Sequence, residues 1–268
     1  MTQAFPLSLH HLCALDVSAA ELVDLAAAND CRLVSLFTNM PGIEGNFPTV
    51  YPADAPDPAA RMADRGVTAC NLEAFPLDGT TDMATFHTGL EVGARLGATK
   101  ASAHVYDAVS LDEAAERFAR MCELAAPYGI TVGLEFYAFA WARDMETAAS
   151  TVRGARQPNG SLVCDTLHFV RNECALESVA RHADIIGYAQ VNDGPASRPR
   201  EEWWDEACAT RELPGTGDFP IVEILRPLRR DTVIEVEVPR EVDRIAGVSA
   251  ADRIAAALAA TREVLGRV

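Results

Sequence analysis

A helix-like stretch followed by a short apolar run recurs along the whole chain, and this repetition constrains the fold more than any other feature. Glycine precedes several of the runs, as in Arg65-Gly66-Val67, where it would close a helix before a β-branched residue opens a strand. The runs have the length of buried strands. They are Leu7–Leu12, Arg32–Phe37, Val67–Glu73, Ala98–His104, Ile130–Phe136, Leu162–Asp165, Ile185–Val191 and Thr232–Val238.

Alternating strands and helices are compatible with either an open doubly wound sheet or a closed barrel. A nucleotide-binding fingerprint would favour the open sheet, but Gly215-Thr-Gly217 follows no expected strand and is followed by Pro220. The even spacing of the apolar runs therefore predicts an α/β fold, a (β/α)8 TIM barrel, as a single domain over residues 1–268.

Two segments interrupt the repeat. Residues 39–58 contain Pro41, Pro48, Pro52, Pro56 and Pro58, so neither a helix nor a central strand is expected there. Residues 192–219 are also rich in proline and glycine, with a short helix expected around Glu201–Thr210. We expect both to be long rim loops at the carboxyl ends of the strands, where TIM barrels build active sites.

Composition excludes several classes of function. The formal net charge of -16 would repel a polyphosphate backbone, so no nucleic acid partner is expected. No apolar run is long enough to cross a membrane, and the first residues lack the pattern of a secretory signal, so we expect no membrane contact and a cytoplasmic protein. The seven cysteines are scattered and are expected to be reduced thiols.

Polar residues stand where several apolar runs end, and in a barrel these positions point into the mouth. Alternation along Ile130–Phe136 turns Glu135 inward. The next run ends at Asp165, which His168 follows three residues later, and the run after that contributes Gln190. The last run offers Glu235 and Glu237, which share one face because they are two residues apart.

Three inward acids would repel one another in a poorly hydrated mouth, unless they were protonated or neutralised by a cation. A divalent metal held by Glu135, Asp165, Gln190 and Glu235 is the simplest explanation, and oxygen ligands suit Mn²⁺ or Mg²⁺. The alternative is that each acid caps a helix or pairs with an arginine. The strand-end residues His10, His11, Glu73 and His104 are individually weaker candidates.

These residues resemble the xylose-isomerase-like superfamily of sugar phosphate isomerases and epimerases, which includes D-tagatose 3-epimerase, hydroxypyruvate isomerase and inosose dehydratase. The resemblance covers nearly the whole chain and rests on five motifs: Gly-Leu-Glu135, Cys-Asp165-Thr-Leu-His168, Gln190-Val-Asn-Asp193, Arg211-Glu-Leu-Pro-Gly-Thr-Gly-Asp218 and Val-Ile-Glu235-Val.

The resemblance implies one divalent metal held by the acids Glu135, Asp165 and Glu235, with Glu135 and Glu235 also moving protons. It further implies that His168 and Arg211 bind substrate oxygens, and we add His104 and Asp193 to the expected substrate-binding residues. Glu237, on the same face of its strand, is the alternative to Glu235 for the role in proton transfer.

The chain departs from the superfamily pattern at Gln190, where a metal-binding histidine is expected. A neutral amide oxygen binds metal more weakly and favours harder cations, so Mn²⁺ or Mg²⁺ is expected before Co²⁺ or Zn²⁺. Loose metal binding, or a Gln190 that contacts only substrate, are the alternatives.

Such a site suits proton transfer at a carbon next to a carbonyl, through an enediolate. We therefore expect a sugar or sugar phosphate isomerase or epimerase acting on a small polyhydroxylated carbonyl compound. A dehydratase or lyase on a polyhydroxylated or non-sugar carbonyl substrate is the first alternative, and a metal-free, non-catalytic barrel is the second. The superfamily often assembles as dimers or tetramers, so a homo-oligomer is also expected.

Overall fold

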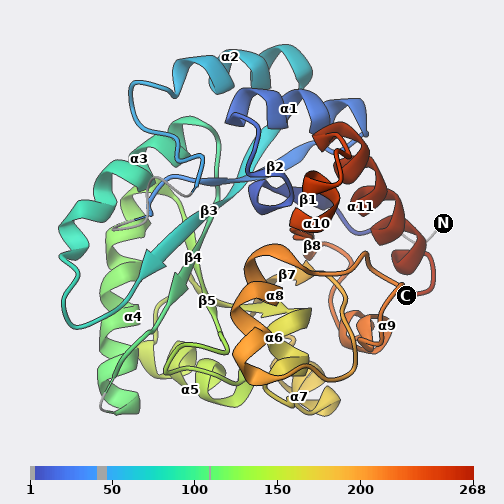
Figure 1. Cartoon of the computed structure of the whole chain (residues 1–268). Helices are drawn as coiled ribbons and strands as arrows, with labels where there is room; N and C mark the ends of the chain where they lie inside the picture. The colour runs from blue at the N-terminus through green and yellow to red at the C-terminus, as the bar shows by residue number, and fades with distance from the viewer. Residues whose placement is uncertain (1–3, 41–46, 109) are drawn as a thin grey trace.

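Eight parallel strands close into a barrel in chain order, which confirms the predicted TIM barrel (Figure 1). The computed structural model describes residues 4–40, 47–108 and 110–268. Each apolar run of the sequence overlaps one strand, and β3 and β6 extend beyond their runs, to Pro76 and back to Gly160. The strands are β1 Leu7–His10, β2 Leu33–Phe37, β3 Thr68–Pro76, β4 Lys100–His104, β5 Thr131–Glu135, β6 Gly160–Asp165, β7 Ile186–Val191 and β8 Val233–Val236.

Helices surround the barrel, and the first and last long helices, α1 and α11, lie near each other where the ring closes (Figure 1). Among the described helices, none combines the length and the apolar character needed to cross a bilayer. The α-helices are α1 Ala19–Ala28, α2 Pro56–Arg65, α3 Phe86–Arg95, α4 Leu111–Ala125, α5 Met145–Ala155, α6 Thr166–Arg171, α7 Leu176–His182, α8 Trp203–Ala209, α9 Ile221–Leu225, α10 Glu241–Ile245 and α11 Ala250–Leu265. The short 3₁₀ helices are η1 His11–Ala14, η3 Met83–Thr85, η4 Ala126–Tyr128 and η5 Arg200–Glu202.

Local sequence explains where the helices begin and end. Ser18 and Glu21 form a capping box at the start of α1, which satisfies backbone N–H groups that the helix leaves free. Gly66 ends α2 at φ 64° and Gly129 ends η4 at φ 70°, both in the left-handed region that favours glycine. The glycines that precede the apolar runs therefore close helices as predicted.

The first rim loop is shorter than the sequence suggested. We expected it to reach residue 58, but α2 begins at Pro56 and includes Pro58. This end of the prediction is wrong because proline is tolerated in the first turn of a helix, where its missing N–H would have no partner. Residues 41–46 of the expected loop lie outside the described residues. Phe47 packs against Phe37 of β2, with ring centroids 4.9 Å apart.

The second rim segment contains η5 and α8, which confirms the helix expected near Glu201–Thr210. A buried ion pair holds it against α6. Nε and Nη2 of Arg171 each lie 2.6 Å from a carboxylate oxygen of Glu206, and Arg198 Nε lies 3.1 Å from the same carboxylate. Because α8 leads into Arg211, this ion pair fixes one wall of the barrel mouth.

We predict that Glu206→Ala lowers the free energy of unfolding by about 3 to 5 kcal/mol, because it leaves the buried Arg171 guanidinium unpaired. Urea unfolding measures this loss. Asp231→Ala, which removes an exposed partner of Arg229, is the control and should change stability by less than about 1 kcal/mol. Equal effects of the two substitutions would contradict the assignment.

Candidate functional site

A cavity of about 100 Å³ opens at the carboxyl ends of the strands and combines charged with aromatic walls. Its acidic and basic lining residues come from many parts of the ring: Glu73, His104, Glu135, His168, Arg211 and Glu237. The remaining lining is largely apolar or aromatic: Leu12, Phe37, Met40, Phe47, Ala74, Tyr106, Tyr137, Trp204, Ala207 and Cys208. Such a pocket fits a small ligand with several polar groups.

Glu135 stands between two histidines on one wall. Its Oε2 lies 2.7 Å from His104 Nε2, and its Oε1 lies 3.6 Å from His168 Nε2. Burial raises the pKa of the Glu135 carboxyl, although His104 opposes the rise. Burial also lowers the pKa of His168 to about 3, and the nearby Arg211 contributes to the decrease. His168 is therefore a neutral imidazole at physiological pH.

Arg211 bridges two acids on the other side of the mouth. Its Nη1 lies 2.9 Å from Asp165 Oδ2 and 2.8 Å from Glu237 Oε2. Burial favours a higher pKa for Asp165, but Arg211, His168 and the hydrogen bonds of its carboxylate together hold the pKa below the ordinary value. For Glu237, burial raises the pKa well above the ordinary value despite Arg211. Of the two acids, Glu237 therefore binds a proton more readily than Asp165.

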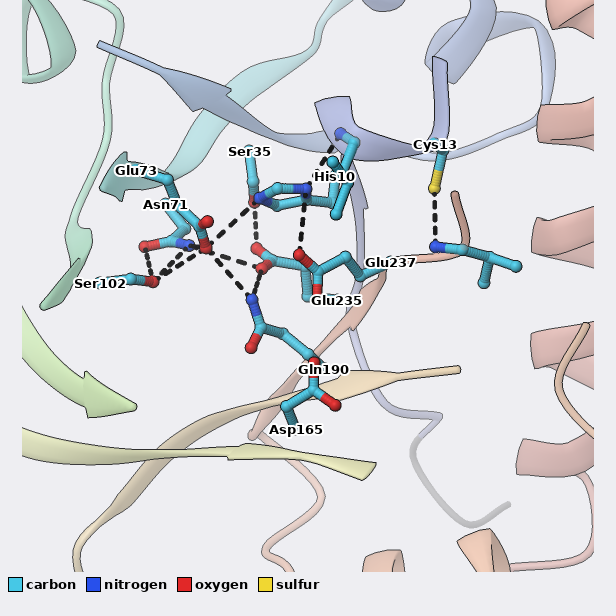
Figure 2. A network of polar contacts seen from close by, with 12 residues as sticks. His10, Cys13, Ser35, Asn71, Glu73, Ser102, Asp165, Gln190, Glu235 and Glu237 are labelled. Carbon is cyan, nitrogen blue, oxygen red and sulfur yellow. Dashed lines mark hydrogen bonds and ion pairs between the residues drawn. The ribbon is translucent and has the colours of Figure 1, made fainter. Parts of the chain in front are cut away.

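A layer of buried polar side chains lies inside the barrel beneath the cavity (Figure 2). Strand register places Asp165, Gln190 and Glu235 side by side on β6, β7 and β8. The Glu235 carboxylate accepts hydrogen bonds from Ser35 Oγ, from Asn71 Nδ2 at 3.4 Å and from Gln190 Nε2 at 3.0 Å. Burial raises the pKa of Glu235 to about 7.

The structure divides the predicted site residues into groups. Glu135, His104, His168 and Arg211 line one cavity. Asp165 is fully buried behind Arg211, while Gln190 and Glu235 belong to the layer beneath. Glu237, the alternative to Glu235, lines the cavity.

Asp193 does not line this cavity. Its carboxylate accepts hydrogen bonds from the backbone N–H groups of Gly194, Gly215 and Phe219 at 2.8 to 3.0 Å. The side chain therefore organises the loop after β7. Gly217 is packed so closely that an added Cβ would lie 2.5 Å from Asp193 Oδ1, which explains the need for glycine there.

Two groups of described residues bring three potential metal ligands within 4.8 Å of one another: His10, Glu73 and Glu237, and Glu135, Asp165 and His168. His10 does not suit a cation. The Leu12 N–H donates to His10 Nδ1 at 3.0 Å, so that nitrogen is unprotonated and the ring proton resides on Nε2. Neither nitrogen then has a free lone pair.

A divalent cation fits better near Asp165 and Gln190. Gln190 Oε1 is buried and has no hydrogen-bond partner among the described residues, while its Nε2 donates to Glu73 and Glu235. An amide oxygen without a donor, close to several buried carboxylates, is a suitable ligand for a hard cation. The residues around Gln190 therefore fit a metal ion.

Sequence reasoning gave too little weight to Glu73 and did not consider Ser35, Asn71, Ser102 and Tyr188. All are buried, and they form the polar layer inside the barrel. The available signal was a small polar residue at an inward position of a strand that otherwise reads as apolar. A single such residue is common, but its recurrence on several strands indicates a polar interior.

The closed barrel and its polar mouth place the protein in the class of TIM barrels with a polar cavity at the carboxyl ends of the strands. The sequence model of the xylose isomerase-like TIM barrel family matches residues 23–264, and the chain belongs to this family. No curated protein matches the sequence significantly.

Several solved structures share the fold over nearly their whole length. The zinc-bound IolI protein has 18% identity and a TM-score of 0.79, with 98% of each chain covered. The probable 3-DHS dehydratase AsbF from Bacillus anthracis has 14% identity and a TM-score of 0.74, covering 97% of this chain and 98% of its own. The D-psicose 3-epimerase from Clostridium cellulolyticum H10 has 13% identity and a TM-score of 0.73, covering 97% and 99%. At these identities the similarity establishes the fold.

We predict that His168 makes the metal-free protein sensitive to acid. Its folded pKa of about 3 lies below the unfolded value of 6.5, so the unfolded chain binds the proton first as the pH falls. Between pH 7 and pH 5, wild type should lose about 2 kcal/mol more stability than His168→Gln. Urea unfolding in a chelating buffer at both pH values measures the difference, and equal losses would show that His168 is not buried in the neutral form.

Proposed function

We propose that the protein catalyses proton transfer at a carbon next to a carbonyl group, as a divalent-metal-dependent isomerase or epimerase of a small sugar or sugar phosphate. The observation that carries this proposal is the presence of Glu135 and Glu237 on separate walls of one cavity. Two carboxyl groups that face a bound ligand from different strands can remove a proton and return one.

Their surroundings support this role. Burial raises the pKa of both Glu135 and Glu237, which makes each carboxylate a better base than an exposed one. His104 orients Glu135, and Arg211 orients Glu237. The neutral His168 imidazole and the Arg211 guanidinium are positioned to hold hydroxyl or carbonyl oxygens of the substrate.

We assign the strand-eight role to Glu237 in preference to Glu235. Glu235 is fully buried, and its carboxylate is engaged by three side-chain donors from other strands. Glu237 is two residues further along, on the same face, and lines the cavity. A base must reach the proton that it removes, so Glu237, which lines the cavity, is the better candidate.

Glu135 and Asp165, whose ligand atoms lie within 4.8 Å of one another, and the Oε1 of Gln190 would hold the divalent metal. When bound, the ion would polarise the substrate carbonyl and stabilise negative charge on its oxygen. Oxygen ligands favour Mn²⁺ or Mg²⁺, and the zinc in the structurally similar IolI protein makes Zn²⁺ a further candidate. Arg211 would then share Asp165 with the ion.

Dehydration is the second candidate function. It needs an acid that donates a proton to a leaving hydroxyl, and the raised pKa of Glu237 keeps a proton available there. The fold similarity to the probable dehydratase AsbF agrees with this chemistry. Both functions begin with the removal of a proton next to a carbonyl.

We predict that Glu135→Gln and Glu237→Gln each reduce turnover by at least a factor of about 100, while Glu235→Gln retains more activity than either. The assay incubates the Mn²⁺-loaded protein with D-fructose, D-tagatose or polyhydroxylated ketoacids in D₂O. NMR detects deuterium next to the carbonyl, and ultraviolet absorbance detects the conjugated carbonyl of a dehydration product. A larger loss in Glu235→Gln than in Glu237→Gln would reverse the assignment of the strand-eight acid.

We predict that wild type binds one Mn²⁺ per chain and that Gln190→Met binds it at least about tenfold more weakly, because methionine offers no hard oxygen ligand. Calorimetric titration after treatment with chelator measures both affinities. Tyr188→Phe, on the same strand, is the control and should bind as wild type does. Unchanged affinity in Gln190→Met would remove Gln190 from the ligand set.

A further inference from the structure

Glu73 is the cavity carboxylate that the proposed proton transfer does not use. It lies on β3, lines the cavity wall, and leaves 8% of its side chain exposed. Burying a carboxylate is unfavourable unless its oxygens have hydrogen-bond donors, so the partners of each oxygen show which one the protein itself satisfies. The two oxygens of Glu73 have different surroundings.

The Oε1 atom of Glu73 is the meeting point of four strands (Figure 2). It accepts hydrogen bonds from Asn71 Nδ2 of β3 at 3.2 Å, from Ser102 Oγ of β4 at 3.0 Å and from Gln190 Nε2 of β7 at 3.1 Å. The Nε2 of His10, on β1, lies 3.3 Å from the same oxygen. The polar interior thus holds this carboxylate in one orientation.

The Oε2 atom has no hydrogen bond or ion pair with any described residue. Because Oε1 is held by the layer beneath and the side chain borders the cavity, Oε2 is the oxygen left for a ligand. A carboxylate oxygen is only an acceptor, and a fixed, poorly hydrated acceptor selects for a ligand that donates a hydrogen bond.

We propose that Glu73 is a specificity-determining residue, which accepts a hydrogen bond from a substrate hydroxyl through Oε2. This inference rests on the proposed function for the class of substrate, a polyhydroxylated carbonyl compound. Arg211 and Glu73 then divide the polar recognition, since Arg211 donates to substrate oxygens and Glu73 accepts from a hydroxyl. A substrate analogue without that hydroxyl would leave a buried acceptor unpaired.

Binding of two simple probes tests the proposal without turnover. Erythritol is a four-carbon polyol, and n-butanol has the same chain with a single hydroxyl. In Glu73→Gln the interior donors favour the amide oxygen at the Oε1 position, which turns the NH₂ group toward the cavity and replaces an acceptor with a donor. We expect erythritol to bind at least about tenfold more weakly to this variant and n-butanol to change by less than about twofold.

NMR titration of the indole N–H of Trp204, a cavity residue, measures both dissociation constants. Ser161→Ala is the control, since it removes a buried hydroxyl inside the barrel that donates to the Val132 carbonyl and belongs neither to the cavity lining nor to the contacts of Glu73, and it should bind erythritol as wild type does. Thermal melting reports whether Glu73→Gln folds. If it does not, Glu73→Asp withdraws the carboxylate by one methylene and should weaken erythritol binding at least about threefold.

The outcomes separate this proposal from the proposed function. Equal erythritol affinity in wild type and a folded Glu73 variant, or no erythritol binding to wild type, overturns the role of Glu73 even if deuterium exchange occurs. Weaker binding in the variant supports that role even if no ketose or ketoacid exchanges deuterium, a result that would count against the proton-transfer function alone.

Discussion

Five carboxyl groups in and beneath the mouth of one barrel are the constraint on which the rest of the site depends. As whole residues, Glu73, Glu135, Asp165, Glu235 and Glu237 are each at most 6% exposed. A buried carboxylate that lacks donors or a cation is strongly unfavourable. The side chains around these acids therefore stabilise the buried carboxyl groups. The same contacts set the pKa values on which the proposed proton transfer depends.

The acids are compensated in three different ways. Asp165 and Glu237 share the charge of Arg211, Glu135 contacts His104, and Glu235 is held by hydroxyl and amide donors. The pKa values differ as a result: they are lowered for Asp165 and Glu73 and raised for Glu135, Glu235 and Glu237. Groups with different affinities for protons within one pocket are what acid–base catalysis requires.

Residues outside the cavity hold the segments that form its walls. The buried pair of Arg171 and Glu206 fixes α8, and Asp193 fixes the loop that follows β7 through three backbone N–H groups. We expected Asp193 to bind substrate. In the structure, its carboxylate instead holds the loop after β7, which explains the presence of an acid at this position of the Gln-x-x-Asp motif. Motif position indicates that a residue matters but does not distinguish contact with a ligand from support of the segment that carries it.

Much of the fold could be read from the sequence, because strand length, helix caps and glycines at helix ends are local properties. Glu135, His104, His168 and Arg211 could be placed at the mouth because the carboxyl ends of parallel strands meet at one face. The exception at Pro56 is also local, since proline at the start of a helix resembles proline in a loop until the following turn is seen.

The sequence by itself determined that Glu235 and Glu237 share an inward face, since alternation in a strand has a period of two. Only the tertiary structure decided which of them reaches the cavity, because the depth of a residue depends on the register of β8 against β7 and β1. The same holds for Glu73, whose orientation is set by a donor from its own strand and by partners from three strands that are distant in sequence. Register and convergence are long-range properties, and no local pattern contains them.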